Sequence, residues 1–298
     1  LYTLDIKVYT ILPLRKNCGL IAFVNNSESF FNLVEERRKI NGQRFDLEKN
    51  LDTEFTGRPN SFKLMNNLQK YEFFNYVAEN TKANELFESF FHKALSTSEA
   101  IGKMRAFAKS LGLMSIIGHV IGLGDRHPSN ILIDLSNGSV IHIDFADCFE
   151  VTQKRRDFPE KVPFRLTRMF INALQGNTSS GEFEDTSIAV MKLMRKEKAS
   201  LAAQLAIFLM ESQKDKTAIE RIIDKLSGKE FDDEDVILEK EKDQKHKIDQ
   251  HSYPQINLRK YTSPTITLSV EDQVHKLIEI AQDPINYCCH FPGWCPFW

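Results

Sequence analysis

Three polar residues, Asp125, Asn130 and Asp144, flank one short apolar stretch of the chain. Asp125 lies five residues before Asn130, within the reach of one loop, and Asp144 follows the run VIHI. An amide oxygen beside a carboxylate suits a hard cation such as Mg²⁺, which prefers oxygen ligands. A further carboxylate, free of the metal, can orient an attacking hydroxyl. The residue types therefore predict a cation-assisted phosphoryl-transfer centre.

A histidine, His127, lies two residues after Asp125. Beside a phosphate, an imidazole can stabilise developing charge or move a proton. A lone histidine is more often structural, and we expect His142, within a predicted strand, to be structural. We expect a direct role for His127.

The hairpin ILIDL–SNGS–VIHIDF is expected to bring Asn130 and Asp144 together. The pair Asn137-Gly138 is a strong signal for a two-residue loop, because both positions favour positive φ. This loop predicts that Ser136 faces Ser139, Leu132 faces Ile143 and Ile131 faces Asp144.

Longer elements must hold this hairpin in place. Residues 4–14 and 19–24 have the composition of two strands of a hairpin. Ser96 and Glu99 form the pattern of a capping box, which opens a helix that continues, nearly all apolar, to about Leu123. We expect this helix to be buried and central. A last amphipathic helix has the apolar stripe Val270, Val274, Leu277, Ile278 and Ala281.

The composition is ordinary for a globular protein and excludes several classes. Lys and Arg number 39 against 41 Asp and Glu, so no basic field indicates a nucleic-acid partner. No run approaches the roughly 18 apolar residues that span a bilayer. Five cysteines, an odd number, argue against a secreted disulfide framework and favour a reducing compartment. The chain begins without Met inside strand-like sequence, so we expect a fragment of a longer polypeptide.

The segments GLGDRHPSNILID and VIHIDFADCFE resemble the catalytic and metal loops of the phosphatidylinositol-3-kinase-related kinase family. The segment FPEKVPFRLTRM resembles the activation loop and following helix of the target-of-rapamycin (TOR) branch of Ser/Thr protein kinases. The tail from about Ile266, ending GWCPFW, is similar to the FATC segment, which the protein-kinase branch has and lipid kinases lack.

This resemblance implies a role for individual residues. Asp125 would be the catalytic base, with His127 as its partner, and Asn130 and Asp144 would hold Mg²⁺, with Mn²⁺ as an alternative. The residues around the adenine of ATP would be Phe23 and Val24 at the hinge, with Leu132 and Ile143 beneath. Cys288 and Cys295 would form a redox pair; the alternative is two unreactive buried thiols.

The resemblance also implies an architecture. The expected fold class is α+β, mostly α: a protein-kinase-like C-lobe with short β-hairpins, a remnant of N-lobe strands, and a FATC helix and tip. The expected domains are the end of the N-lobe and hinge (1–28), the C-lobe (29–228), a charged linker (229–265) and the FATC segment (266–298). Within the C-lobe lie the catalytic loop (122–130), the metal motif (144–146) and the activation loop (144–163).

Partners and location are implied in the same way. We expect protein substrates, a WD40-propeller subunit on the helices between Glu35 and Asn80, other TOR-complex subunits, and no nucleic acid. The tip formed by Trp294, Phe297 and Trp298 would pack on the kinase domain, with peripheral membrane contact as an alternative. The expected location is cytoplasmic, with association to endomembranes.

The sequence departs from the family pattern in four places. Ala146 replaces the Gly after Asp-Phe, which predicts a shifted loop equilibrium with metal binding intact. Phe23 replaces a hinge Trp. No glycine-rich phosphate loop is found, and Lys7 is interpreted as an exposed strand residue rather than the ATP-contacting Lys. We therefore expect the isolated chain to be inactive.

Two alternatives stay open: a lipid kinase, for which Lys154, Arg155 and Arg156 give a modest basic cluster, or a non-catalytic docking module.

Overall fold

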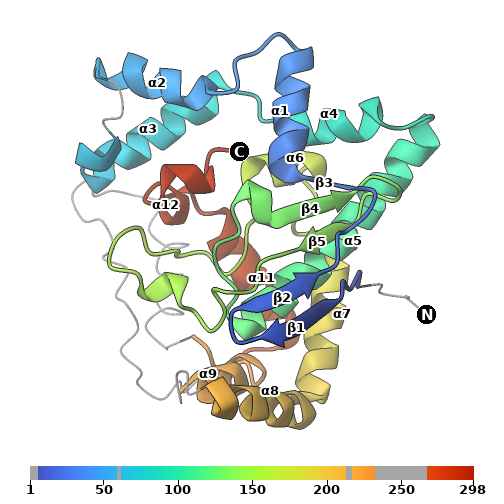
Figure 1. Cartoon of the computed structure of the whole chain (residues 1–298). Coiled ribbons are helices and arrows are strands. Elements are labelled where there is room, and N and C mark those ends of the chain that lie inside the picture. The colour runs from blue at the N-terminus through green and yellow to red at the C-terminus, as the bar shows by residue number, and fades with distance from the viewer. Residues whose placement is uncertain (1–5, 59–61, 213–216, 232–266) are drawn as a thin grey trace. The chain divides into compact units, whose positions relative to one another are not determined.

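The computed structural model describes residues 6–58, 62–212, 217–231 and 267–298. They form two compact units, residues 1–190 with 275–298 and residues 191–274. Most of the segment predicted to be a charged linker lies outside the described residues. The elements are mainly helices with two small sheets, which confirms the predicted fold class (Figure 1).

The first unit contains all the strands found in the described residues, of which β1 and β2 form a separate hairpin. The strands are β1 (Ile11–Arg15), β2 (Cys18–Ile21), β3 (Ser27–Ser29), β4 (Ile131–Asp134) and β5 (Val140–His142). The helices before the active-site region are α1 (Phe30–Ile40), α2 (Leu47–Thr56), α3 (Asn67–Asn80), α4 (Glu85–His92) and α5 (Thr97–Ile121). After it come α6 (Arg168–Ala173) and the start of α7 (Glu182–Lys196).

The catalytic hairpin is the β4–β5 pair of a three-stranded antiparallel sheet in the order β3-β4-β5. The predicted register is wrong by two residues, because Leu132 faces Ile141 and Ile131 faces His142. The Asp134 carboxylate accepts from the amide of Ser136 at 2.9 Å, so an Asx turn widens the loop. Asn137 does not have the positive φ that a two-residue loop requires. A shift of two keeps each side chain on its predicted face of the sheet.

Helix α5 is the central element behind this sheet, as predicted. Ser96 accepts from the amide of Glu99 at 3.2 Å. Glu99 does not complete a capping box, because its carboxylate accepts from Leu95 at 2.8 Å and pairs with Lys103. The helix buries residues along most of its length and ends at Gly122, which has φ +64°. This left-handed turn sends the chain directly into the catalytic loop.

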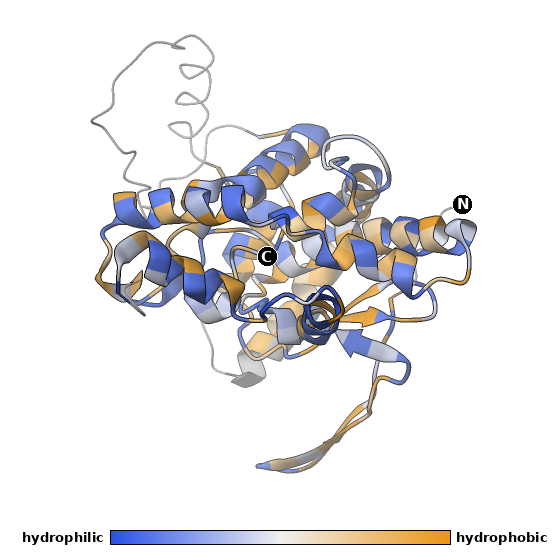
Figure 2. Cartoon of the chain, turned by 90° about the horizontal axis from the view of Figure 1, so that it is seen from above, coloured by the Kyte–Doolittle hydropathy of each residue, from blue (hydrophilic) through white to orange (hydrophobic). Residues whose placement is uncertain are grey.

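The N-terminal hairpin β1–β2 is shorter than predicted and exposed along both strands. It reaches away from the rest of its unit, and its colouring is largely hydrophobic (Figure 2). Residues 6–10 are irregular rather than strand. Lys7 is exposed, as predicted, but it lies in this irregular segment rather than in a strand, and it pairs with Asp134.

The tail forms α11 (Val270–Gln282), α12 (Pro284–Tyr287) and a short 3₁₀ turn at Pro292–Trp294. Four of the five predicted stripe residues on α11 are buried: Val274, Leu277, Ile278 and Ala281. The tip packs on helices of the first unit, as expected. Phe297 lies 5.5 Å, between ring centroids, from Phe73 and from Phe74. Trp298 is 3% exposed and lies beneath Arg38.

The second unit contains the end of α7, α8 (Lys198–Ser212), α9 (Ala218–Lys225) and the start of α11. Within it, Arg195 donates to the carbonyl of Leu268 at 3.1 Å and to the side chain of Gln273 at 2.6 Å. None of the helices in the described ranges is long and apolar enough to cross a membrane.

Candidate active site

The predicted catalytic loop and the predicted metal motif each contain an Asp in a sparsely populated backbone conformation. Asp125 has φ +57° and Asp144 has φ +58°. Such conformations are unfavourable for residues other than Gly and persist where the surrounding structure enforces them. Ala146 does not have positive φ, so its backbone does not need Gly. Nine residues other than Gly have positive φ in the described part of the chain, and two of them are the carboxylates predicted to do chemistry.

One buried cation, Arg126, joins the two loops. Its guanidinium donates to the carbonyls of Gly124 at 2.8 Å and Ile143 at 2.7 Å. It also donates to the carbonyls of Asn130 and Asp144. The side chain is 3% exposed, and burial lowers its pKa below the usual range, opposed first by the nearby Asp125 carboxylate. Arg126 thus fixes the backbone on both sides of the predicted metal position.

Asn130 and Asp144 are brought to one end of the hairpin. The amide of Ile143 donates to the carbonyl of Asn130 at 3.1 Å, which places Asp144 one residue further along. The Asn130 side-chain amide donates to the carbonyl of Asp125 at 3.0 Å, leaving its Oδ1 as the oxygen available to a cation. The Asp144 side chain is exposed, and its Oδ1 accepts from the amide of Ala146 at 3.1 Å.

The Asn130 Oδ1 and the Asp144 carboxylate fit as two ligands of a magnesium ion whose other ligands are not side chains that the structure describes. An amide oxygen and an exposed carboxylate are hard ligands of the kind that Mg²⁺ takes in small number from proteins. Among the described residues, no group of three or more His, Cys, Asp or Glu is placed to hold a metal. A cation here would therefore depend on water and phosphate oxygens for its other ligands.

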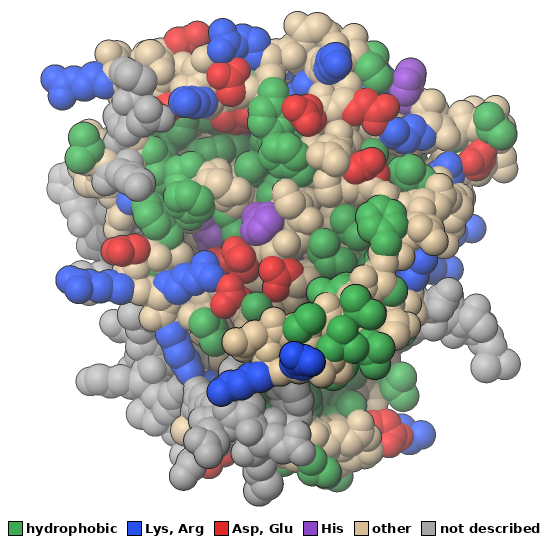
Figure 3. Space-filling view, in the orientation of Figure 1, with side chains coloured by type: hydrophobic (Ala, Val, Ile, Leu, Met, Phe, Trp, Pro, Cys, Tyr) green, Lys and Arg blue, Asp and Glu red, His purple; other side chains and the backbone are tan. Residues whose placement is uncertain are grey.

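His127 is half-buried and caps the short 3₁₀ turn Pro128–Asn130, its Nδ1 accepting from the amide of Ser129 at 3.2 Å. Burial lowers its pKa below the usual range, opposed by Asp125 and assisted by Arg126. A neutral ring whose Nδ1 accepts has its proton on Nε2. His127 can therefore donate one hydrogen bond from Nε2. In the space-filling view, acidic side chains gather beside a histidine near the middle of this face (Figure 3).

A buried carboxylate, Glu160, holds the backbone of Asp125. Both of its oxygens accept from the Asp125 amide, each at 3.0 Å. Glu160 is 7% exposed, and burial raises its pKa to about 7, opposed by the hydrogen bond from the Asp125 amide and assisted by the charge of the Asp125 carboxylate. On the exposed side, Arg155 lies 4.0 Å from the Asp125 carboxylate and pairs with Asp147 at 2.6 Å.

A second buried cation, Arg165, joins the catalytic loop to the tail. It donates to the carbonyls of Trp294 and Cys295, each at 2.7 Å, and to that of Arg126 at 3.2 Å. Its guanidinium lies 4.3 Å from the centroid of the Trp294 ring. Burial lowers the pKa of Arg165 to about 10, which leaves it charged near neutrality. Arg165 therefore connects the tail to Arg126 through hydrogen bonds to the backbone of both.

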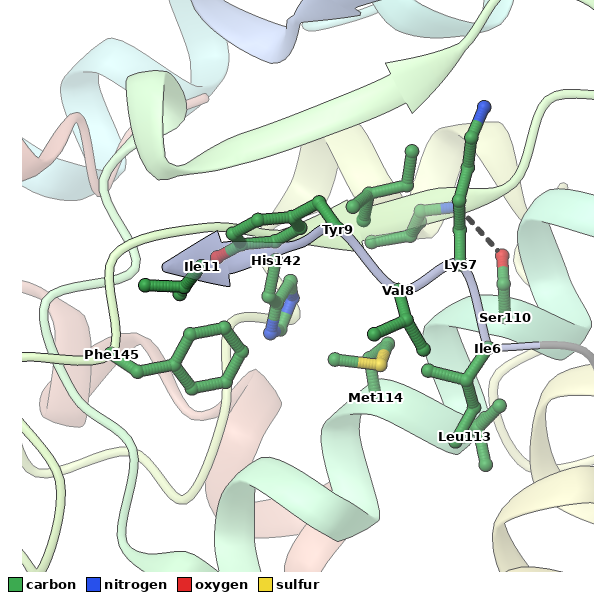
Figure 4. A pocket seen from close by; sticks show the side chains of 12 residues that line it. Ile6, Lys7, Val8, Tyr9, Ile11, Ser110, Leu113, Met114, His142 and Phe145 are labelled. Carbon is green, nitrogen blue, oxygen red and sulfur yellow. Dashed lines mark hydrogen bonds between the residues drawn. The ribbon is translucent and has the colours of Figure 1, made fainter. Parts of the chain in front are cut away.

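The residues predicted to contact adenine differ in exposure, and none of them lines the cavity beside His142. Phe23 is 84% exposed, and Val24, Leu132 and Ile143 are half-buried. A cavity of about 230 Å³ lies instead under residues 6–11, with Tyr9, His142 and Phe145 around it (Figure 4). Burial lowers the pKa of His142 to about 3, so this ring is neutral, and its structural role stays a prediction.

The cysteines predicted to form a redox pair are both free thiols. The Cys288 thiol contacts Cys289, with a distance of 3.7 Å between the sulfur atoms. The Cys295 thiol lies 3.7 Å from the carbonyl of Gly293. The pairing of Cys288 with Cys295 stays a prediction.

Sequence reasoning missed Arg126, Glu160 and Arg165. All three are charged residues that are buried: Arg126 within GDRH, Glu160 and Arg165 within FPEKVPFRL. For Glu160 and Arg165, a charge inside an apolar or Pro-rich segment is a usable signal, because such groups are rarely buried without partners.

Family models match two stretches of the chain. The model of phosphatidylinositol 3- and 4-kinases matches residues 2–216, and that of the FATC domain matches residues 267–298. The chain is 34% identical to Serine/threonine-protein kinase TOR2 of Saccharomyces cerevisiae and 33% identical to Serine/threonine-protein kinase tor1 of Schizosaccharomyces pombe. Both alignments cover 99% of the chain, which spans only 13% and 14% of the two relatives.

Solved structures support the fold. The FAT and kinase domain of CtTel1 has a TM-score of 0.69 at 24% identity, over 98% of this chain and 19% of that one. The Tel1 kinase butterfly symmetric dimer has a TM-score of 0.72 at 24% identity, over 99% of this chain and 12% of that one. The resemblance found in the sequence is confirmed: the chain belongs to the phosphatidylinositol 3- and 4-kinase family and carries a FATC domain.

Proposed function

We propose that this chain is the phosphoryl-transfer region of a Ser/Thr protein kinase of the TOR type, which moves the γ-phosphoryl group of ATP to protein hydroxyls. The observation that carries the proposal is the junction made by Arg126, which holds the loop of Asp125 and Asn130 against that of Asp144. Likeness to two TOR kinases over 99% of the chain supports the choice of branch.

The chemistry follows from the placement of the carboxylates. Asp125 is partly exposed, so its carboxylate can reach a substrate hydroxyl, accept its proton and orient its oxygen. Magnesium bound by Asn130 and Asp144 would neutralise phosphate oxygens as the leaving group departs. Neutral His127 can donate from Nε2 to an oxygen on which charge develops. Glu160 and Arg126 supply positioning, because their bonds hold the N–H and the C=O of the peptide group between Gly124 and Asp125.

Protein rather than lipid is the proposed substrate. The FATC match at residues 267–298 supports this choice, since the resemblance reserves that segment for the protein-kinase branch. The deciding assay gives the full-length parent protein and Mg-ATP a protein substrate and phosphoinositide vesicles side by side. Phosphate should appear on Ser and Thr and not on lipid; transfer to lipid alone would overturn the choice of substrate.

The partners and the location are proposed by likeness to the TOR kinases alone. A WD40-propeller subunit would bind helices α1 to α3, and further subunits would bind elsewhere on the parent protein. Cytoplasmic residence with endomembrane association is proposed on the same basis. Co-purification of the parent protein from its own cells, compared with a variant in which exposed Leu64 and Leu68 are changed to Ser, tests the propeller site.

A further inference from the structure

A cation from the predicted activation loop, Arg155, lies beside the proposed catalytic base. Its Nη2 donates to the Asp147 carboxylate at 2.6 Å, and its Nη1 lies 4.0 Å from the Oδ1 of Asp125. The second distance is an ion-pair separation and is too long for a hydrogen bond. Because Nη1 makes no hydrogen bond to any residue that the structure describes, its N–H groups remain available to another acceptor.

Arg155 is fixed to the predicted catalytic loop through both its side chain and its backbone. The carbonyl of Asp147, its side-chain partner, accepts from the amide of Gly124 at 2.8 Å. The Arg155 amide follows the short 3₁₀ turn Thr152–Lys154 and donates to the carbonyl of Thr152 at 3.4 Å. Thr152 is 1% exposed, and a Cβ at Gly124 would overlap its side chain. The position of Arg155 therefore follows from close packing rather than from a chance surface contact.

The proposed reaction centre carries an excess of negative charge toward solvent. Asp125, Asp144 and Asp147 are exposed or half-buried. The guanidinium of Arg126 is 3% exposed and donates to backbone carbonyls, so it offers little to a substrate. The Arg155 side chain, by contrast, is 41% exposed. The phosphate groups of ATP would add negative charge here, and Arg155 is placed to neutralise part of it.

We propose that Arg155 is a further catalytic residue, whose guanidinium binds two oxygens of the phosphoryl group while that group is transferred. This role rests on the proposed function. In the transfer, the bond from the γ-phosphorus to the bridging oxygen breaks, and ADP keeps the electron pair. A new bond forms from the phosphorus to the substrate hydroxyl oxygen, and the hydroxyl proton passes to Asp125.

The distances allow this contact. A hydroxyl that donates to Asp125 has its oxygen about 2.7 Å from the carboxylate. The phosphorus that it attacks lies about 3–3.5 Å from that oxygen. A guanidinium nitrogen 4.0 Å from the same carboxylate can therefore reach the phosphoryl oxygens by a change of side-chain torsion angles. The planar fork of arginine matches two such oxygens at once.

A cation beside a base also disfavours protonation of that base. In phosphoryl transfer this cost is small, because the transition state is loose and the hydroxyl needs orientation more than deprotonation. The charge spread over the phosphoryl oxygens gains more from the cation. The geometry therefore favours Arg155 as a residue that accelerates transfer over Arg155 as a block on Asp125.

The test uses variants of the full-length parent protein, assayed for phosphorylation of a protein substrate and for ATP binding. Arg155→Ala should lower kcat by about 10²-fold and leave the Kd for ATP within about threefold of wild type. Arg155→Lys should lower kcat by about tenfold, because lysine keeps the charge and loses the planar fork. Arg105→Ala, which removes an exposed arginine 3.2 Å from the Glu182 carboxylate, is the matched control and should leave kcat within about twofold of wild type.

Free guanidinium ion separates a chemical role of Arg155 from a structural one. At millimolar concentration, far below that used for unfolding, it should raise kcat of Arg155→Ala by at least about fivefold, because it can occupy the vacated position and bind the phosphoryl oxygens. The wild-type protein and Arg105→Ala should show no such increase.

Three outcomes would overturn the proposal. An increase in kcat for Arg155→Ala would show that Arg155 blocks Asp125. A kcat within about twofold of wild type would show that Arg155 takes no part in the transfer. A loss that guanidinium ion does not relieve would assign Arg155 to structure alone. Failure of the wild-type parent to phosphorylate protein is a separate result, read before any variant is compared, and it would contradict the proposed function itself.

Discussion

The guanidinium of Arg126 donates to the backbone carbonyl of Asp144, eighteen residues further along the chain. The same group holds the carbonyls of Gly124, Asn130 and Ile143. Hydrogen bonds through Arg126 therefore join the loop of the proposed base to the loop of the proposed metal ligands. These bonds hold the two loops at a fixed spacing.

Arg126→Lys should separate these two loops. A lysine keeps the charge but cannot reach four carbonyls with one ammonium group, so buried acceptors lose their donors. We expect kcat of the parent kinase to fall by about 10²-fold, while KM for ATP changes less. Steady-state phosphorylation of a protein substrate measures both constants.

The matched control is Arg105→Lys, on the exposed face of α5. It should leave kcat within about twofold of wild type. Equal kcat values for the two variants would show that Arg126 does not align the site.

Asn130→Ala should lower the affinity of the active site for magnesium. Removing one of two protein ligands leaves the cation held by Asp144 and phosphate oxygens alone. The Mg²⁺ concentration that gives half of the maximal rate should rise by about tenfold, and Asp144→Ala should lower kcat by about 10²–10³-fold. Rate measurements over a Mg²⁺ titration separate the two effects. An unchanged Mg²⁺ dependence in both variants would remove these residues from the metal site.

Glu160 should make stability depend on pH. Its pKa is about 7 when folded, against 4.5 for the ordinary group, so the folded state binds the proton more tightly. The corresponding stability is present below about pH 4.5 and is lost as the pH rises through about 7, up to about 3 kcal/mol.

Glu160→Gln removes this titration and imitates the protonated carboxyl group. Its unfolding midpoint should match wild type near about pH 5 and exceed it near about pH 8. Glu54→Gln, an exposed carboxylate on α2, is the control and should follow wild type at both pH values. A constant difference between Glu160→Gln and wild type would contradict the predicted titration.

The tail should stabilise the first unit through its last residue. Trp298 is 3% exposed and packs on Phe30, Phe31 and Phe45 at 5.8–5.9 Å between ring centroids. Trp298→Ala should cost about 3–5 kcal/mol, measured by denaturant unfolding. Phe291→Ala removes an aromatic residue that is 51% exposed and should cost no more than about 1 kcal/mol. Similar losses would indicate that the tip is not a packed element.

Much of the fold was predictable because its signals are local. The run from Ser96 to Leu123 has an N-cap and continuous apolar character, and it forms α5. The hairpin was also predicted, but its register was not, since the Asp134 side chain competes for the turn. Asn-Gly favours a two-residue loop only when no neighbouring side chain offers the backbone another partner.

Site residues could be proposed from the sequence where chemistry fixes residue type and spacing, and not where contacts are long-range. Asp125, Asn130 and Asp144 were identified by their types and spacing, and their catalytic and metal-binding roles stay predictions. The bonds from Glu160 to the Asp125 amide and from Arg165 to the tail span 35 and 129–130 residues. No local pattern encodes these partners, so the positioning residues emerged only from the folded chain.

The most direct test of the account is Asp125→Asn in the full-length parent protein, assayed for phosphate transfer to a protein substrate and for ATP binding. The amide keeps the size of the side chain but cannot accept the hydroxyl proton. We predict that kcat falls by about 10³-fold or more while the Kd for ATP stays within about threefold of wild type. Undiminished phosphorylation of protein would contradict the assignment of the catalytic centre.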